Sequence, residues 1–196
     1  MKQTAVAKYA GLVLLIVSGV VYGVGDPLLR LISYQGPILS GALLGWFAMH
    51  DYTPKEKYVE TEDGELIPIA SVVLRGRAWL FISIAILMML PWFTPFVYTM
   101  ALQLQWLFIG AFLSEFAGGF IIGYSITSLR FMEKFTLYSL GFAADVFFII
   151  ILYIDSGIFH VSQQVLLNDV FILAYLIKLL EGVAFGVYIV RRVNVV

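Results

Sequence analysis

Long apolar stretches alternate with short polar ones along most of the chain. A helix that crosses the hydrocarbon core of a bilayer needs about 20 mostly apolar residues, and six stretches meet that requirement. We expect spans at residues 6–24, 28–49, 78–93, 98–126, 136–154 and 169–190. The predicted fold class is therefore all-α, a polytopic integral membrane protein whose single membrane domain covers residues 1–196.

Glycines and prolines set the boundaries between several of these stretches. Gly25 and Pro27 favour a turn between the first two spans. The apolar stretch over residues 78–126 is too long for one helix, and Pro91 and Pro95 lie where it has to divide. The sequence therefore predicts a short connection between the third and fourth spans.

Residues 50–77 form the largest polar segment. Two β-prone runs, residues 57–61 and 66–69, flank an acidic turn that contains Asp63 and Gly64. Asp-Gly between β-prone runs favours a hairpin, because both central positions of the turn need a positive φ. We expect a short cytoplasmic β-hairpin between helices 2 and 3. Its acidic residues do not have EF-hand spacing and are interpreted as a solvated turn, so no metal site is predicted: Glu60, Glu62, Asp63 and Glu65.

Lysine and arginine residues indicate the orientation. In a six-span topology ten of them fall on one side, whereas Arg30 lies on the other. By the positive-inside rule both termini are cytoplasmic, in a multi-pass protein of the cell membrane. The ten are Lys2, Lys8, Lys55, Lys57, Arg75, Arg77, Arg130, Lys134, Arg191 and Arg192.

Composition excludes several classes of function. The chain is 61% hydrophobic and 13% charged, against about 25% charged in soluble domains. It contains no cysteine, which excludes disulfides and thiolate metal sites. Its net charge of −1, without a basic patch, gives no case for nucleic acid. His50 and His160 are the only histidines, and the topology places them at opposite faces. They cannot ligate one haem together, so no cofactor is predicted.

Four ionisable residues lie near the centres of apolar spans. Glu115 is in the fourth span, Asp145 in the fifth, and Lys178 and Glu181 in the sixth. A charge at the bilayer centre costs roughly 2.5–3.5 kcal/mol on insertion scales, so such residues mark ion or proton pathways. We expect these four as the ion- or proton-binding candidates, at a midplane site between helices 4, 5 and 6.

The spacing also predicts how these groups interact. Lys178 and Glu181 are three residues apart on one helix face, which favours an ion pair. A low dielectric and a neighbouring like charge favour the neutral form of a carboxyl, so Glu115 or Asp145 is expected to hold a proton. The alternative is that the four groups only neutralise or hydrogen-bond one another and have a structural role.

Glycines recur at a spacing of four residues, which lets helices approach closely. We expect these pairs to pack helices, either within the chain or between subunits. The pairs are Gly19 and Gly23, Gly41 and Gly45, Gly119 and Gly123, and Gly182 and Gly186.

Three functions remain open from the sequence. The leading one is a small membrane transporter or an ion- or proton-pathway protein, in contact with the lipid bilayer. The second is a non-catalytic subunit of a larger membrane complex, such as a respiratory or oxidase assembly, with other membrane subunits or further copies of the chain as partners. The third is a lipid-modifying membrane enzyme, although no Ser-His-Asp set or phosphate-binding loop is present. In size and six-span topology the chain is similar to substrate-binding components of vitamin importers, without a motif that assigns residue roles.

Overall fold

The computed structural model describes residues 3–61 and 66–193 of a predominantly helical chain. Five helical segments are long and apolar enough to cross a membrane, and the protein is accordingly a multi-pass membrane protein in contact with lipid. These segments are Gln3–Val24, Ile69–Phe93, Gln105–Ile126, Phe131–Ile158 and Gln163–Val190.

Short irregular pieces interrupt several of the segments. The α-helices are α1 (Gln3–Val24), α2 (Pro27–Ile32), α3 (Gln35–Asp51), α4 (Ile69–Leu74), α5 (Ala78–Met89), α6 (Pro95–Gln103), α7 (Gln105–Ile126), α8 (Phe131–Ile158), α9 (Gln163–Phe171) and α10 (Leu179–Val193). Turns of 3₁₀-helix occur at Lys55–Lys57, Arg75–Arg77 and Leu90–Phe93, and a π-helix, Ile172–Lys178, joins α9 to α10. The two strands are β1 (Tyr58–Glu60) and β2 (Leu66–Pro68).

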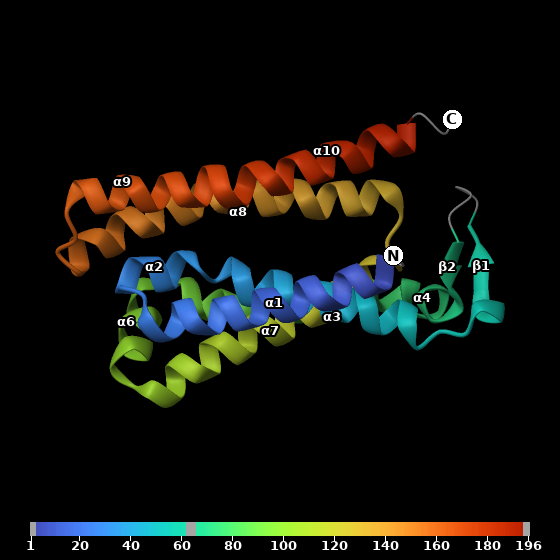
Figure 1. Cartoon of the computed structure of the whole chain (residues 1–196), viewed down its shortest axis with the longest axis horizontal. Helices are drawn as coiled ribbons and strands as arrows, with labels where there is room; N and C mark the ends of the chain where they lie inside the picture. The colour runs from blue at the N-terminus through green and yellow to red at the C-terminus, as the bar shows by residue number, and fades with distance from the viewer. Residues whose placement is uncertain (1–2, 62–65, 194–196) are drawn as a thin grey trace.

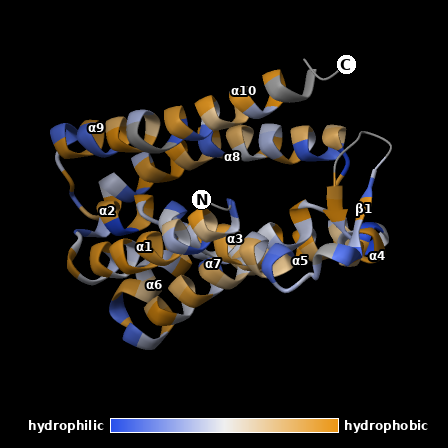
Figure 2. Cartoon of the chain, turned by 45° about the vertical axis from the view of Figure 1, so that its right-hand side comes forward, coloured by the Kyte–Doolittle hydropathy of each residue, from blue (hydrophilic) through white to orange (hydrophobic). Residues whose placement is uncertain are grey.

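The helices form two layers (Figure 1). In the first layer α3 packs against both α1 and α7, and α5 also packs against α7. The second layer is a long hairpin of α8 with α9 and α10. Apolar residues run along the helices, and hydrophilic residues gather toward the two ends (Figure 2). Both chain termini and the β-hairpin lie at one end, which we call the terminal end (Figure 1).

The layers are held together at the other end, which we call the closed end. There α2 contacts both α8 and α9, and α6 contacts α8. Their buried apolar side chains form one cluster that spans the two layers, and burial of such side chains favours the contact. The cluster comprises Leu28, Leu31, Ile32, Tyr34, Tyr98, Phe148, Leu152 and Leu173.

Glycines make the closest helix contact, between α3 and α7. A Cβ on Gly41 would overlap the carbonyl oxygen of Phe116 on α7, and one on Gly45 would meet the next turn of that helix. Gly119 and Gly123 do the reverse, because a Cβ on either would overlap the backbone of α3. The predicted packing role is confirmed for these two pairs, which interlock in one interface.

The other two glycine pairs do not pack helices within the described chain, so for them the predicted packing between subunits stays a prediction. An added Cβ would find open space at Gly19, Gly23 and Gly186 and only an ordinary contact at Gly182. On α1 the contact with α3 is made by another glycine instead. The carbonyl oxygen of Gly11 accepts a hydrogen bond of 2.7 Å from the Ser40 hydroxyl.

The predicted second span, residues 28–49, is not one continuous helix. It breaks at Ser33 and Tyr34, between α2 and α3. Pro37 explains the break, because it has no N–H for the Ser33 carbonyl and its ring crowds that carbonyl. The Ser33 carbonyl instead accepts a tighter hydrogen bond of 2.9 Å from the Gly36 N–H.

The predicted fourth span, residues 98–126, also divides. Leu104 has an extended backbone (φ −119°, ψ 101°), which ends α6 and starts α7 at Gln105. The division before this span is confirmed, since a 3₁₀ turn and Thr94 separate α5 from α6.

The polar segment after α3 is shorter than predicted. The hairpin is confirmed as an antiparallel pair with Tyr58 opposite Pro68 and Glu60 opposite Leu66. Helix begins again at Ile69, however, so the predicted loop 50–77 and the start of the third span at residue 78 are wrong. The acidic turn with Glu62, Asp63 and Glu65 lies outside the described residues. The last two helices also exceed the predicted spans 136–154 and 169–190, at Phe131–Ile158 and Gln163–Val190.

Candidate functional site

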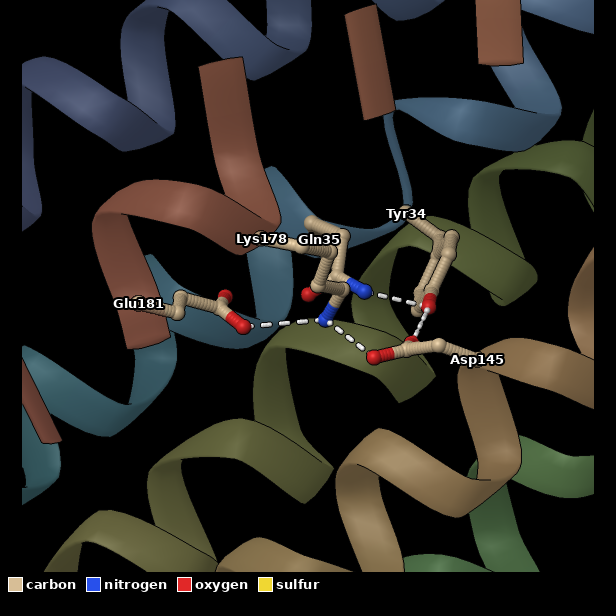
Figure 3. Close-up of polar contacts among 5 residues, drawn as sticks. All are labelled: Tyr34, Gln35, Asp145, Lys178 and Glu181. Carbon is tan, nitrogen blue, oxygen red and sulfur yellow. Dashed lines mark hydrogen bonds and ion pairs between the residues drawn. The ribbon is translucent and has the colours of Figure 1, made fainter. Parts of the chain in front are cut away.

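Three of the four predicted ionisable residues meet between α8 and the segment that leads into α10. The ammonium nitrogen of Lys178 lies 3.1 Å from Oδ2 of Asp145 and 2.9 Å from Oε2 of Glu181 (Figure 3). The ion pair between Lys178 and Glu181, predicted from their spacing, is confirmed. We call these three residues the charged cluster.

The junction between α2 and α3 contributes the remaining polar groups. The hydroxyl of Tyr34 donates to Oδ1 of Asp145 at 3.3 Å, and the amide nitrogen of Gln35 donates to the Tyr34 oxygen (Figure 3). The predicted site between helices 4, 5 and 6 is therefore corrected. Its third wall is the break in the second predicted span rather than the fourth span.

Two irregular stretches of backbone lie at the charged cluster. Tyr34 stands at the break between α2 and α3, and Lys178 is the last residue of the π-helix. π-helical turns and interrupted membrane helices leave backbone groups outside the regular ladder, and both occur frequently at functional sites. The sequence places its polar side chains where the helices are least regular.

The charge of the cluster is unbalanced. Two carboxylates share one ammonium, so the cluster carries −1 when all three groups are ionised. The three side chains are 15–23% exposed, which means that they are only partly buried. A partly accessible site with one uncompensated negative charge favours the binding of a proton or another cation.

Glu115 is not part of this cluster, and the prediction that it joins the other three is wrong. It is 3% exposed, and its Oε2 accepts a hydrogen bond from the hydroxyl of Tyr22 on α1. The Tyr22 ring lies 5.1 Å from Phe108 and 5.0 Å from Phe112, centroid to centroid. The glycines of α7 hold that helix against α3, and Glu115 pairs with α1 in the same layer.

Sequence reasoning missed two buried acids, Asp169, which is 5% exposed, and the more deeply buried Asp155. It is 0% exposed, and neither of its carboxyl oxygens has a hydrogen-bond partner in the described part of the chain. The predicted fifth span ended one residue before it, but α8 continues to Ile158. The apolar residues Ile158 and Phe159 beyond Asp155 were the available signal that the helix continues.

A cavity of about 1090 Å³ opens at the terminal end, between the two layers. Its walls include Trp46 and His50 on α3, Tyr138 on α8 and Phe185 on α10. The rings of Tyr138 and Phe185 stack at 4.2 Å, and those of Trp46 and His50 at 4.1 Å. Phe185 is one helical turn from Glu181, but Asp145, Lys178 and Glu181 are not among the residues that line the cavity.

No family model, curated protein or solved structure matches this chain. The function of the protein is therefore inferred from the charged cluster, the cavity, and the buried acids Glu115 and Asp155.

Proposed function

We propose that the protein is a small carrier or ion-pathway protein of the cell membrane, in which Asp145 binds a proton or another cation. The observation that carries the proposal is the unbalanced charge of the cluster, which lies halfway along α8 and is only partly buried. An ionisable group at that depth is costly, and function is the usual reason for it.

The topology that we propose has six crossings with both termini in the cytoplasm. The sixth crossing is made by α2 and α3 together, which run the length of the first layer despite their break (Figure 1). Lys8, Arg75 and Arg130 belong to the terminal end, which supports a cytoplasmic location of that end. The cavity would then open to the cytoplasm.

Protonation of Asp145 offers a simple coupling step. A proton that binds at Oδ2 removes the negative charge that faces Lys178, and the ammonium then interacts mainly with Glu181. Because Asp145 is on α8 whereas Lys178 and Glu181 are on the other arm of the hairpin, this step weakens one contact between the two arms. Binding of a cation at the cluster thus weakens the contact of α8 with the arm of the second layer that carries Lys178 and Glu181.

Proton flux into proteoliposomes with a pH-sensitive dye inside tests this proposal. Wild-type protein should discharge an imposed pH gradient, and Asp145→Asn should abolish that flux. Glu60→Gln, a matched change of carboxyl to amide on the β-hairpin, should leave it unchanged. Normal flux in Asp145→Asn, or its loss in Glu115→Gln alone, would place the proton-binding group elsewhere.

One observation favours the alternative of a subunit in a larger assembly. Gly19 and Gly23 lie on a face of α1 that no part of the described chain covers, next to the exposed side chains of Ile16 and Val20. Small residues on a lipid-facing helix allow close packing with a second helix. Cross-linking of single cysteines at Gly19 in native membranes would support this function, especially if the protein shows no flux.

A further inference from the structure

Asp155 is a buried acid that the charged cluster does not explain. It lies on α8 about three turns beyond Asp145, toward the closed end. It is wholly buried, and both carboxyl oxygens lack a hydrogen-bond partner among residues 3–61 and 66–193. Unpaired buried polar groups are rare in native proteins, and each one calls for an explanation.

The immediate surroundings of Asp155 are apolar. Leu152 and Phe159 share its face of α8, and Leu152 belongs to the apolar cluster of the closed end. The ring of Phe159 meets the edge of Tyr98 on α6, with centroids 6.1 Å apart. The hydroxyl proton of Tyr98 is donated to the carbonyl oxygen of Pro27 at 2.5 Å. Tyr98 is therefore not a donor to Asp155, whose carboxyl oxygens have no hydrogen-bond partner among the described residues.

Charged groups lie near Tyr98 without pairing to Asp155. Arg30 is engaged elsewhere, since its Nη2 donates to the carbonyl of Gly23 at 3.1 Å and its guanidinium lies 5.3 Å from the centre of the Phe108 ring. No lysine or arginine in the described part of the chain forms an ion pair with Asp155. The titratable and charged groups of the surrounding elements are Asp26 before α2, Arg30 on α2, Tyr98 on α6, Glu115 on α7 and Asp169 on α9.

The chemistry of the pocket selects a proton as the ligand. An ionised carboxylate without a partner is strongly disfavoured in apolar surroundings, and the neutral acid avoids that cost. A metal ion needs several oxygen or nitrogen ligands, and the described residues contain no group of three acidic, histidine or cysteine side chains that could hold one.

We infer that Asp155 is a second proton-binding site, which holds its proton while the closed end is shut. Release of the proton requires water at the carboxyl, which is wholly buried at the end of the molecule where the apolar cluster joins the layers. Asp155 at the closed end and Asp145 at the charged cluster then mark two positions of a proton path along α8. Only the direction of this path depends on the proposed function, because the protonation of Asp155 follows from its own surroundings.

Infrared spectroscopy of the full-length protein in lipid at neutral pH tests the inference. A protonated aspartic acid gives a carbonyl band that shifts when aspartate carries ¹³C in its side-chain carboxyl. We expect this band in the wild type, its loss in Asp155→Asn, and its return without the aspartate isotope shift in Asp155→Glu. Asp145→Asn, which changes an ion-paired carboxylate, should leave the band unchanged.

Two results would overturn the inference: absence of the band from the wild type, which requires no variant to fold, or an undiminished band in Asp155→Asn. Proton flux separates this inference from the proposed function. If the band depends on Asp155 but the wild type shows no flux, then the proton site stands and the carrier proposal fails. If flux depends on Asp145 but the band is absent, then the carrier proposal stands and the role of Asp155 fails.

Discussion

Lys178 holds two carboxylates at once, one from its own helical segment and one from α8. This arrangement stabilises the helical hairpin of α8 with α9 and α10 only while all three charged residues are present, because each charge is neutralised by another. Removal of one member of a buried ion pair destabilises a protein by more than the intact pair stabilises it, because the remaining charge is left unpaired. The cluster therefore makes the contact between the two arms sensitive to a single charge.

The first prediction follows for Lys178→Met. Loss of the ammonium leaves Asp145 and Glu181 facing each other, and we expect a loss of about 3 kcal/mol in the free energy of unfolding. The double variant Asp145→Asn with Lys178→Met should recover part of this loss, because it removes one of the two unpaired carboxylates. Thermal unfolding in detergent micelles measures both. A double variant less stable than Lys178→Met would show that the carboxylates do not share the ammonium.

His160 ends α8 in the left-handed region, with φ 52°. The N–H of Val161 bonds to the carbonyl of Ser156 at 2.9 Å, which is the closure seen where helices usually end in glycine. We predict that His160→Gly raises the free energy of unfolding by about 0.5–1 kcal/mol, because glycine adopts this conformation without a steric penalty. His160→Ala should give no such gain in the same melting experiment, and an equal gain in both variants would contradict the prediction.

Local spacing predicted the part of the site that lies on one helix. Lys178 and Glu181 are three residues apart, and that alone was sufficient to predict their pairing. The partnership with Asp145 depended on which helices meet, which apolar composition does not encode. Glu115 was misplaced for the same reason, because its partner Tyr22 lies 93 residues away in the chain. Asp155 was missed through a boundary error of one residue.

At the scale of elements, the rigid part of the molecule is the contact of α3 with α7. Glycines on both helices let the backbones touch, so dispersion between them replaces the hydrophobic drive that is absent between helices in lipid. The helices around the charged cluster are irregular instead, with the break before α3 and the π-helix before α10. The first layer is thus packed regularly, whereas the helices are interrupted at the charged cluster, where the two layers meet.

A matched pair of alanine substitutions tests this difference. Gly119→Ala adds a methyl group that overlaps the backbone of α3, and overpacking of this kind costs about 1–3 kcal/mol. Gly19→Ala adds the same group in open space and should be neutral or slightly stabilising. Thermal unfolding of both variants in detergent checks the prediction. Equal stability would mean that α3 and α7 do not approach as closely as described.

Prolines predicted some boundaries and not others. Pro91 and Pro95 indicated the division between α5 and α6, which the structure confirms. Pro37 carried an equally clear signal for the break before α3, but the apolar residues around it favoured one continuous span. The break at Leu104 coincides with neither a proline nor a glycine. It occurs where α6 folds over the closed end and α7 begins.

At the scale of the whole molecule, the two layers are joined by the apolar cluster at the closed end and by the hydrogen bond of 3.1 Å from Trp79 on α5 to Glu133 on α8 toward the terminal end. The apolar cluster joins α2, α6, α8 and the second arm of the hairpin, whereas the cavity of about 1090 Å³ lies between the layers at the other end. The charged cluster stands between these two regions. The carrier proposal requires that the cluster be reached from the cavity and from no other side, which is the geometry of a carrier in one of its two states.

Cysteine accessibility tests that one-sided access most directly, because the chain contains no cysteine of its own. Ala184→Cys places a thiol on the cavity wall three residues from Glu181, and Val146→Cys places one on an exposed apolar face of α8. In sealed vesicles of known orientation, we expect a membrane-impermeant cationic thiol reagent to modify Ala184→Cys from the cytoplasmic side only. The Val146→Cys thiol should remain unmodified.

The reaction at Ala184→Cys should also be faster with a cationic than with an anionic reagent of the same size, because Asp145 and Glu181 together outweigh Lys178. Modification from the outer side, or a faster reaction with the anionic reagent, would contradict an accessible, negatively charged site that faces the cytoplasm.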